Sequence, residues 1–171
     1  MVESVPSIET PRLRLRSFRE DDLPAYAALC ADPEVMRYVR GHAIDRPEAW
    51  REMALFLGHW ALRGYGMWAV EERASGALVG RIGLHYPDGW PEREVGWALA
   101  REVWGRGYAT EGCRAALDYA FRSLGWPRII SLIHPDNERS KRLALRVGMQ
   151  FETQVVVRDT RVDLFALTAR S

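Results

Sequence analysis

Hydrophobic and polar residues alternate at the start of the chain. In residues 10–18 (TPRLRLRSF), Leu13 and Leu15 are separated by arginines. A period of two residues predicts a strand with one buried face. Residues 65–73 and 77–86 are also strand-like, and the short ASGA segment between them indicates a hairpin. Residues 94–99 (EVGWAL) complete a predicted three-stranded meander.

A spacing of three and four residues replaces this alternation elsewhere. The apolar residues from Trp50 to Ala61 recur at that spacing, which predicts a helix capped by Asp45 and ended by Gly64. A shorter helix is expected over residues 23–31, with a capping box formed by Ser17 and Glu20. A second short turn is expected to begin at Asp32 and Pro33 and to extend through residue 38.

The second half of the chain alternates helices with strands. A helix is predicted over residues 107–124, and a second one is capped by Asn137 and continues through residue 147. The continuous apolar run at residues 128–134 is typical of a central strand covered on both faces. Closing strands are expected near residues 150–158 and 161–168. This order of elements predicts a mixed sheet with helices on its faces.

Composition restricts the class of protein. The 171 residues are 47% hydrophobic and carry a net charge of +1, which favours one globular domain over residues 1–171. The small net charge argues against a nucleic-acid or anionic-lipid partner, and no apolar run is long enough to span a membrane. Two cysteines and no recognisable signal peptide lead us to expect a cytoplasmic protein with free thiols.

The most informative segment for chemistry is residues 104–111 (WGRGYATE), which precedes the helix expected from residue 107. Its glycines allow a ligand to approach the backbone, and the amides at a helix N-terminus favour an anion such as a diphosphate. The alternative is that the GRG sequence only forms a turn. The segment lacks the Gly-Lys-Ser/Thr of a Walker loop and the GxGxxG of a dinucleotide fold.

Several segments together resemble a known family. They are TPRLRLRSFREDD, ADPEVMRYV, EVGWAL, WGRGYATEG and HPDNERSKRLALRVGMQFE. Their order and spacing are similar to those of the GNAT acyltransferases, and most of all to the RimJ/RimL-type N-acetyltransferases. The resemblance extends over about residues 10–168.

The resemblance implies a fold, a co-substrate and a site. The fold would be an α/β GNAT fold, with a mixed, mostly antiparallel splayed sheet of about seven strands and helices on both faces. Acetyl-CoA would lie in the opening of that sheet. The implied cofactor-binding residues are Trp97, Ala98, Leu99, Gly105, Arg106, Gly107, Tyr108, Ala109, Thr110, Asn137 and Ser140. A backbone N–H of residues 97–99 would bind the thioester carbonyl.

The chain departs from the family pattern at two positions. Trp104 stands where the general phosphate motif begins with Gln or Arg, as the RimJ/RimL branch often allows. Ala144 stands where many members of the family place a tyrosine that protonates the departing thiolate. The hydroxyl of Ser140 is the substitute candidate for that role, although it could also do no more than bond a carbonyl group.

The base must match the amine that it deprotonates. Freeing a lysine amine near pH 7.4 costs roughly 4 kcal/mol, whereas an α-amine costs well under about 1 kcal/mol. A weak base acting through water would therefore suffice for an α-amine. The candidates are Glu94, His85 and Asp88, with Glu94 preferred. Glu94 could instead be a solvated carboxylate at the strand edge or form an ion pair with Arg93 or Arg81.

Aromatic residues are candidates for the acceptor side. Trp68, His85 and Trp90 are assigned to substrate binding, while Trp60 is expected in the core. Trp90, in the turn DGWPE, is also a candidate for a homodimer contact. The histidines lack ligand spacing, so no metal site is expected. Glu111 is expected to stabilise its helix rather than to react.

The sequence therefore predicts an acetyl-CoA-dependent N-acetyltransferase that acts on a primary amine, with a peptide or protein α-amine preferred over a polyamine or an antibiotic. One alternative is a catalytically silent module that binds acyl-CoA and regulates a partner. A more remote alternative is a nucleotide-binding domain that uses the same glycine-containing segment.

Overall fold

The structure is a computed structural model that describes residues 5–169. Its sheet has eight strands in the order β1-β2-β3-β4-β5-β6-β8-β7. The strands are β1 (Ile8–Glu9), β2 (Leu13–Arg16), β3 (Met67–Glu72), β4 (Leu78–His85), β5 (Glu94–Leu99), β6 (Arg128–Ile133), β7 (Gln150–Val157) and β8 (Thr160–Thr168). The helices are α1 (Leu23–Ala31), α2 (Pro33–Met36), α3 (Arg46–Arg63), α4 (Tyr108–Asp118) and α5 (Glu138–Arg146). The mixed, mostly antiparallel sheet that was expected is present, with eight strands instead of about seven.

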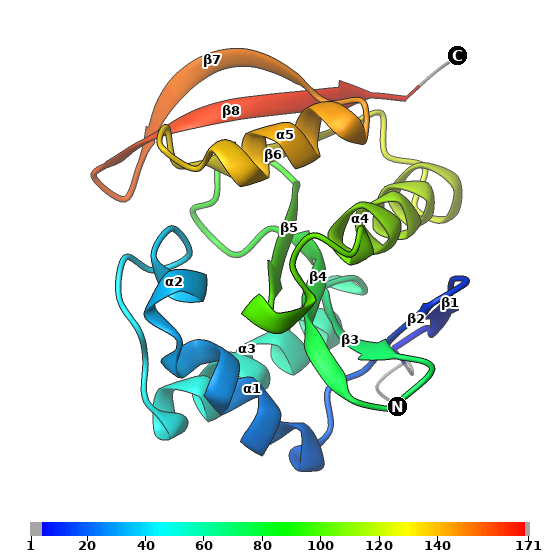
Figure 1. The fold of residues 1–171 in the computed structure, drawn as a ribbon. Coiled ribbons are helices and arrows are strands. Elements are labelled where there is room, and N and C mark those ends of the chain that lie inside the picture. The colour runs from blue at the N-terminus through cyan, green and yellow to red at the C-terminus, as the bar shows by residue number, and fades with distance from the viewer. Residues whose placement is uncertain (1–4, 170–171) are drawn as a thin grey trace.

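The sheet divides between β5 and β6. These two strands are parallel and pair only at Glu94 and Ile130, whereas all the other neighbouring strands are antiparallel. Beyond that single pair, β5 and β6 separate and leave an opening, which we call the fork. One arm of the sheet consists of β1–β5, and the other consists of β6, β8 and β7 (Figure 1).

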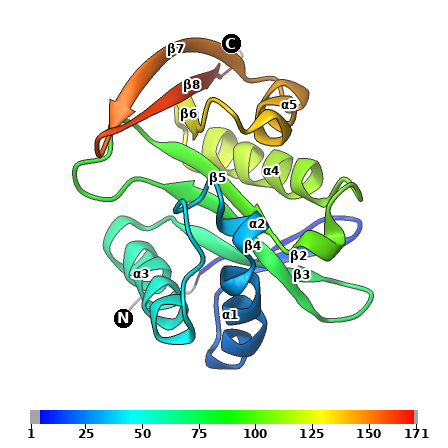
Figure 2. The same ribbon diagram turned by 60° about the vertical axis from the view of Figure 1, so that its left-hand side comes forward.

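Helices cover both faces of the first arm. Figure 2 shows α1 and α3 on one face and α4 on the other. The alternation of β3 explains how one strand serves both faces, because Met67 and Ala69 join the core under α1 and α3. Trp68 and Val70 join the larger core, which also contains Cys113 of α4.

Local signals in the sequence place the helix ends. Asp45 caps α3 and forms a capping box with Glu48, and Gly64 ends that helix at a φ of 74°. The side chain of Asn137 caps α5, as expected. The capping box predicted for Ser17 and Glu20 is wrong. The cap before α1 is formed between Arg19 and Asp22, because the Asp22 carboxylate accepts the Arg19 N–H at 2.8 Å.

Two other boundaries differ from the expectation. The first predicted strand is shorter than residues 10–18, because Thr10 accepts the Leu13 N–H and turns the chain between β1 and β2. The helix expected over residues 107–124 ends its α-helical part at Asp118 and continues as a π-helical segment, Tyr119–Ser123. Within residues 5–169, no helix combines the length and the apolar character needed to cross a membrane.

Candidate active site

A cleft of about 820 Å³ opens at the fork. Its walls are formed by β5, by the N-terminal ends of α4 and α5, and by α2 with the residues after it. Among its lining residues are Trp97, Ala98, Leu99, Gly105, Gly107, Tyr108, Ala109, Thr110, Asn137 and Ser140. The fold therefore brings together all but one of the residues that were expected around acetyl-CoA; the exception is Arg106.

The N-terminal end of α4 forms an anion cradle on one wall of this cleft. Gly105 and Gly107 have φ angles of 78° and 80°, in the left-handed region that glycine adopts without strain. The first amides of a helix have no acceptor within the helix, and no side chain of the described residues caps α4. The N–H groups of residues 107–110 are therefore available to a diphosphate.

Arg106 is not part of the anion cradle, although the sequence predicted that it would be. Its N–H donates to Val103 O at 3.4 Å, and its guanidinium lies 3.7 Å from the Glu72 carboxylate, on β3. Its carbonyl oxygen accepts a hydrogen bond from Arg12 Nη1 at 2.7 Å. Arg106 thus fixes the position of the segment, and its side chain, which was expected to bind the cofactor, is not part of the cleft lining.

Glu111 has the structural role that was expected, through contacts that the sequence did not reveal. Its carboxylate accepts the Thr10 hydroxyl at 2.6 Å, and it also accepts the backbone N–H and the Nε of Arg12. These bonds tie the first turn of α4 to the turn between β1 and β2. They lower the pKa of Glu111 against the opposing effect of burial.

The direction of the β5 backbone decides which amides face the fork. Arg93 O accepts from Ile130 N of β6, and Leu99 O accepts from the Trp104 indole. Ala100 N donates in the opposite direction, to Val79 O of β4. Because the polar backbone groups of successive strand residues point to opposite sides, the N–H groups of Trp97 and Leu99 point into the fork. The Ala98 N–H points to β4, so of the three candidates Ala98 can contribute only its side chain to the cleft.

Glu94 lies at the closed end of the fork and is 7% exposed. Its Oε1 accepts the Leu132 N–H of β6 at 2.9 Å, and its Oε2 accepts the Trp90 indole N–H at 2.7 Å. Burial raises the pKa of Glu94 from 4.5 to about 7, while the two hydrogen bonds and the charge of Arg81 act in the opposite direction. The alternative role, an ion pair with Arg93 or Arg81, is not found; Arg81 donates instead to the Tyr26 hydroxyl at 3.1 Å.

His85 lies opposite Glu94 in the β4–β5 ladder. Its ring stacks on His59, with centroids 5.7 Å apart, and contacts Trp90 edge to face at 5.2 Å. Burial and the charge of Arg81 lower the pKa of His85 to about 3. The imidazole is therefore neutral near pH 7 and is a poor proton acceptor, which leaves Glu94 as the better base of the two.

Ser140 lies in the first turn of α5, across the fork from β5. Its backbone N–H donates to the Asn137 side chain at 3.2 Å, and its Oγ accepts the Trp97 indole N–H at 3.1 Å. Because that oxygen is the acceptor in the second bond, the Ser140 hydroxyl proton is free to point to another atom. Ala144 of α5, which stands at the position where many members of the family have a tyrosine, is buried.

Trp68 and Trp90, the two tryptophans assigned to substrate binding, both donate their indole N–H groups to other parts of the protein. Trp68 is 0% exposed in the core and donates its indole N–H to Pro6 O at 2.8 Å, so its assignment to substrate binding is wrong. Trp90 is half-buried, and its N–H is bound to Glu94 rather than presented at the surface. Trp60 belongs to the core, as expected.

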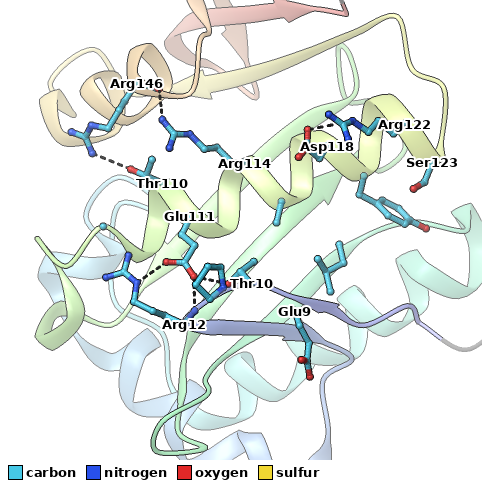
Figure 3. A pocket seen from close by; sticks show the side chains of 15 residues that line it. Glu9, Thr10, Arg12, Thr110, Glu111, Arg114, Asp118, Arg122, Ser123 and Arg146 are labelled. Carbon is cyan, nitrogen blue, oxygen red and sulfur yellow. Dashed lines mark hydrogen bonds and ion pairs between the residues drawn. The ribbon is translucent and has the colours of Figure 1, made fainter.

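A second cavity, of about 850 Å³, lies on the other side of α4 (Figure 3). It shares Gly107, Thr110 and Arg146 with the cleft. Its arginines are largely held by the protein. Arg146 donates to the Thr110 hydroxyl at 3.0 Å, and Arg114 donates to Arg146 O at 3.4 Å. No group of His, Cys, Asp and Glu side chains within residues 5–169 has the arrangement of a metal site.

Several residues of the cleft wall were not predicted from the sequence, among them Arg139, Trp104 and Tyr38. The Arg139 guanidinium lies 3.8 Å from the centre of the Trp104 ring, and the Trp104 indole is bound to Leu99 O at 2.9 Å. Tyr38 lines the same cleft and stacks near His134, with centroids 5.0 Å apart. Only Trp104 carried a signal in the sequence, as the residue that departs from the general phosphate motif.

Comparison with known proteins agrees with this geometry. A family model described as an acetyltransferase (GNAT) domain matches residues 12–150. The uncharacterized protein YkkB of Bacillus subtilis is 33% identical over 154 residues, which cover 85% of this chain and 86% of YkkB. The uncharacterized N-acetyltransferase YoaA of the same organism is 33% identical over 153 residues, covering 86% of this chain and 84% of YoaA.

A solved structure is similar over nearly the whole chain. The crystal structure of an acetyltransferase from Agrobacterium tumefaciens has a TM-score of 0.88 and 30% identity, and the match covers 99% of this chain and 98% of that one. The splayed sheet, the free amides of α4 and the cleft between them fit acetyl-CoA, the acetyl donor of this family. The chain belongs to the GNAT family and is an acetyl-CoA-dependent N-acetyltransferase.

Proposed function

We propose that this N-acetyltransferase acts on the α-amine of a peptide or protein N-terminus and belongs to the RimJ/RimL-like branch. The observation that carries the proposal is the environment of Glu94, whose pKa burial raises to about 7. An α-ammonium group has a pKa of about 8, so transfer of its proton to Glu94 costs only about 1 kcal/mol. Transfer from a lysine ammonium, with a pKa of about 10.4, costs roughly 5 kcal/mol.

The donor is held by the cradle and by β5. The amides of residues 107–110 bind the diphosphate, and Arg12 keeps the cradle in place through its bond to Arg106 O. The N–H groups of Trp97 and Leu99 are directed to the carbonyl oxygen of the thioester, where negative charge develops. Acetyl-CoA supplies the activated acetyl group that the amine attacks.

Two side chains move the protons. A strand rises about 3.3 Å per residue, so Glu94 lies about 10 Å along β5 from Trp97, which is three residues further on. Glu94 therefore takes the proton of the amine through water. The Ser140 hydroxyl, which accepts the Trp97 indole N–H, donates its proton to the departing sulfur as the C–S bond breaks. It regains a proton from the attacking nitrogen, which loses one when the amide forms, so the hydroxyl is restored. Neutral His85, which faces Glu94 in the β4–β5 ladder, does not compete for the proton.

The acceptor is tested with a panel of amines. We would measure thiol release from acetyl-CoA with peptides that have a free N-terminus, with the same peptides blocked at the N-terminus but containing lysine, and with polyamines. The highest kcat/KM is expected for the free N-terminus. Turnover of blocked peptides or polyamines at equal or higher kcat/KM would contradict the α-amine proposal.

The role of Glu94 is tested separately. The kcat/KM of the wild type should fall on the acid side with an apparent pKa near 7, and Glu94→Gln should replace that limb by one with the pKa of the substrate amine, about 8. Gln keeps the size of the side chain and can still accept one hydrogen bond. An unchanged acid limb in Glu94→Gln would eliminate Glu94 as the base.

A further inference from the structure

The carboxylate of Glu94 is bound by two donors from different parts of the fold. Leu132 N, on β6, binds one oxygen, and the indole of Trp90 binds the other. Trp90 lies in the loop between β4 and β5, four positions before Glu94. Each oxygen keeps one unused acceptor position, so a proton can still be received while both bonds are in place.

The indole of Trp90 is itself held on two sides. The His85 ring contacts it edge to face at 5.2 Å, and the Arg158 guanidinium lies 5.3 Å from its centre. Arg158 is at the tip of the β7–β8 hairpin, which lies beside the loop between β4 and β5 in both views (Figures 1 and 2). The loop before Glu94 is thus in contact with the second arm of the sheet.

The tip of that hairpin is occupied by unusual residues. Arg158 and Asp159 have φ angles of 47° and 62°, in the left-handed region that two-residue hairpins require. Asn and Gly are the usual residues in such turns because other residues are strained there. An arginine at this position is explained by its side chain, which lies against the face of Trp90.

We propose that Trp90 is a positioning residue: its indole N–H holds the carboxylate of the base Glu94, and Arg158 holds the indole in place. The proposal rests on the proposed function, in which Glu94 accepts the proton of the amine. It differs from the sequence-based assignment of Trp90 to substrate binding. Trp90 acts here through Glu94.

The physical basis is the difference between the two forms of the acid. An N–H donor stabilises the carboxylate more than the protonated acid, so its loss raises the pKa of Glu94. The other charged group that acts on Glu94 is Arg81, on β4. The facing His85 is kept neutral by burial and by the charges of Arg81 and Arg158. Trp90 is therefore the one donor at Glu94 that a side-chain substitution can remove.

The test is Trp90→Phe, which keeps an aromatic ring and removes the N–H. In this variant the pKa of Glu94 should rise by about one to two pH units. That is the effect expected when a charged group loses a hydrogen bond. The kcat/KM should then be reduced about fivefold to fiftyfold near pH 7 and recover towards pH 9. A purely structural role would lower the rate at every pH alike.

Trp50→Phe is the matched control. Trp50 also donates its indole N–H to a carboxylate at 3.4 Å, but it is 46% exposed on α3 and its partner is Glu20 rather than Glu94. Its pH–rate profile should be that of the wild type. Arg158→Asn removes the guanidinium and keeps a residue that accepts the turn, so its profile should shift in the same direction as that of Trp90→Phe, but less.

The pKa of Glu94 is also measured without substrate, by carbon-13 NMR of glutamate-labelled protein. The resonance of Glu94 is identified by its absence in Glu94→Gln. If Trp90→Phe leaves this pKa unchanged, the proposal is overturned. If the NMR pKa rises but kcat/KM does not follow it, Trp90 still positions Glu94, and the proposed role of Glu94 as the base fails.

Discussion

Glu94 shows how one residue acquires its chemistry from its surroundings. A glutamate at the start of a strand is ordinary in sequence, and its competing role was a surface ion pair. If the ladder between β5 and β6 continued, Leu132 N would donate to a backbone carbonyl of β5. In the structure the ladder stops, and Leu132 N donates to the Glu94 carboxylate instead. The same side chain therefore closes the fork and carries a pKa of about 7.

Ser140 is the residue that replaces the missing tyrosine at position 144 in the proposed mechanism. We expect Ser140→Ala to reduce kcat by about a hundredfold, the lower range for loss of a general acid, with the Kd for CoA unchanged. The reason is that Trp97, which loses an acceptor, is half-buried and can be bound by water. Steady-state kinetics and calorimetric titration with CoA measure the two quantities.

Ser123→Ala is the control for this variant, since Ser123 is exposed beside the second cavity. It should have the kinetics of the wild type. A kcat for Ser140→Ala within about twofold of the wild type would remove Ser140 from the mechanism. A weakened Kd with unchanged kcat would make it a binding residue instead.

At the scale of elements, the cradle depends on how α4 begins. Gly107 has a φ of 80°, and a Cβ atom there would lie 3.3 Å from Arg12 Nη2. The bonds of Arg12 to Glu111 and to Arg106 O hold the cradle from the side of β2. The anion site therefore consists of a helix end together with the turn between β1 and β2.

Gly107→Asp and Gly107→Asn form a matched pair that tests the cradle. Asp and Asn have the same shape and both tolerate the left-handed region, so backbone strain and the contact with Arg12 are nearly common to them. We expect the Kd for CoA to rise at least tenfold more in Gly107→Asp than in Gly107→Asn, because only Asp places a negative charge beside the diphosphate. Calorimetric titration at low salt measures the difference.

High salt is the second condition of that experiment. The difference in Kd for CoA between the two variants should become smaller at high salt, because salt screens the repulsion between the aspartate and the diphosphate. Equal affinities for the two variants at low salt would mean that the diphosphate does not lie at the start of α4. Thermal unfolding of both proteins checks that the fold is retained.

At the scale of the whole molecule, buried charge makes stability depend on pH. The folded state raises the pKa of Glu94 from 4.5 to about 7, so it holds this proton more tightly than the unfolded chain does. The contribution of Glu94 to stability is therefore fully present below pH 4.5 and is lost as the pH rises to about 7. A change of that size corresponds to about 3 kcal/mol.

Glu94→Gln should remove this dependence. We expect the free energy of unfolding of the wild type to fall, relative to that of Glu94→Gln, by up to about 3 kcal/mol between pH 5 and pH 8. Chemical denaturation across that range measures it. His85, whose pKa is lowered, stabilises the fold as the pH rises, but this effect is common to both proteins and cancels in the difference. A difference that is constant across this range would show that Glu94 is already ionised at pH 5.

The sequence determined the parts of this protein that depend on neighbours along the chain. Alternation and helical spacing predicted the core of every long element, and Asp45, Gly64 and Asn137 marked helix ends because caps act within one turn. The glycine-containing segment before α4 predicted an anion site for the same local reason. The family resemblance supplied the acetyl donor and the splayed sheet.

Only the tertiary structure decided what depends on burial and on distant partners. The strand pattern could not show that Trp68 is enclosed, that Arg106 turns to Glu72, or that the Ala98 amide faces β4. The partners of Glu94 come from the loop between β4 and β5 and from β6, and the packed fold leaves it only 7% exposed. A pKa is set by the field and the water around a group, and the packed fold alone creates both.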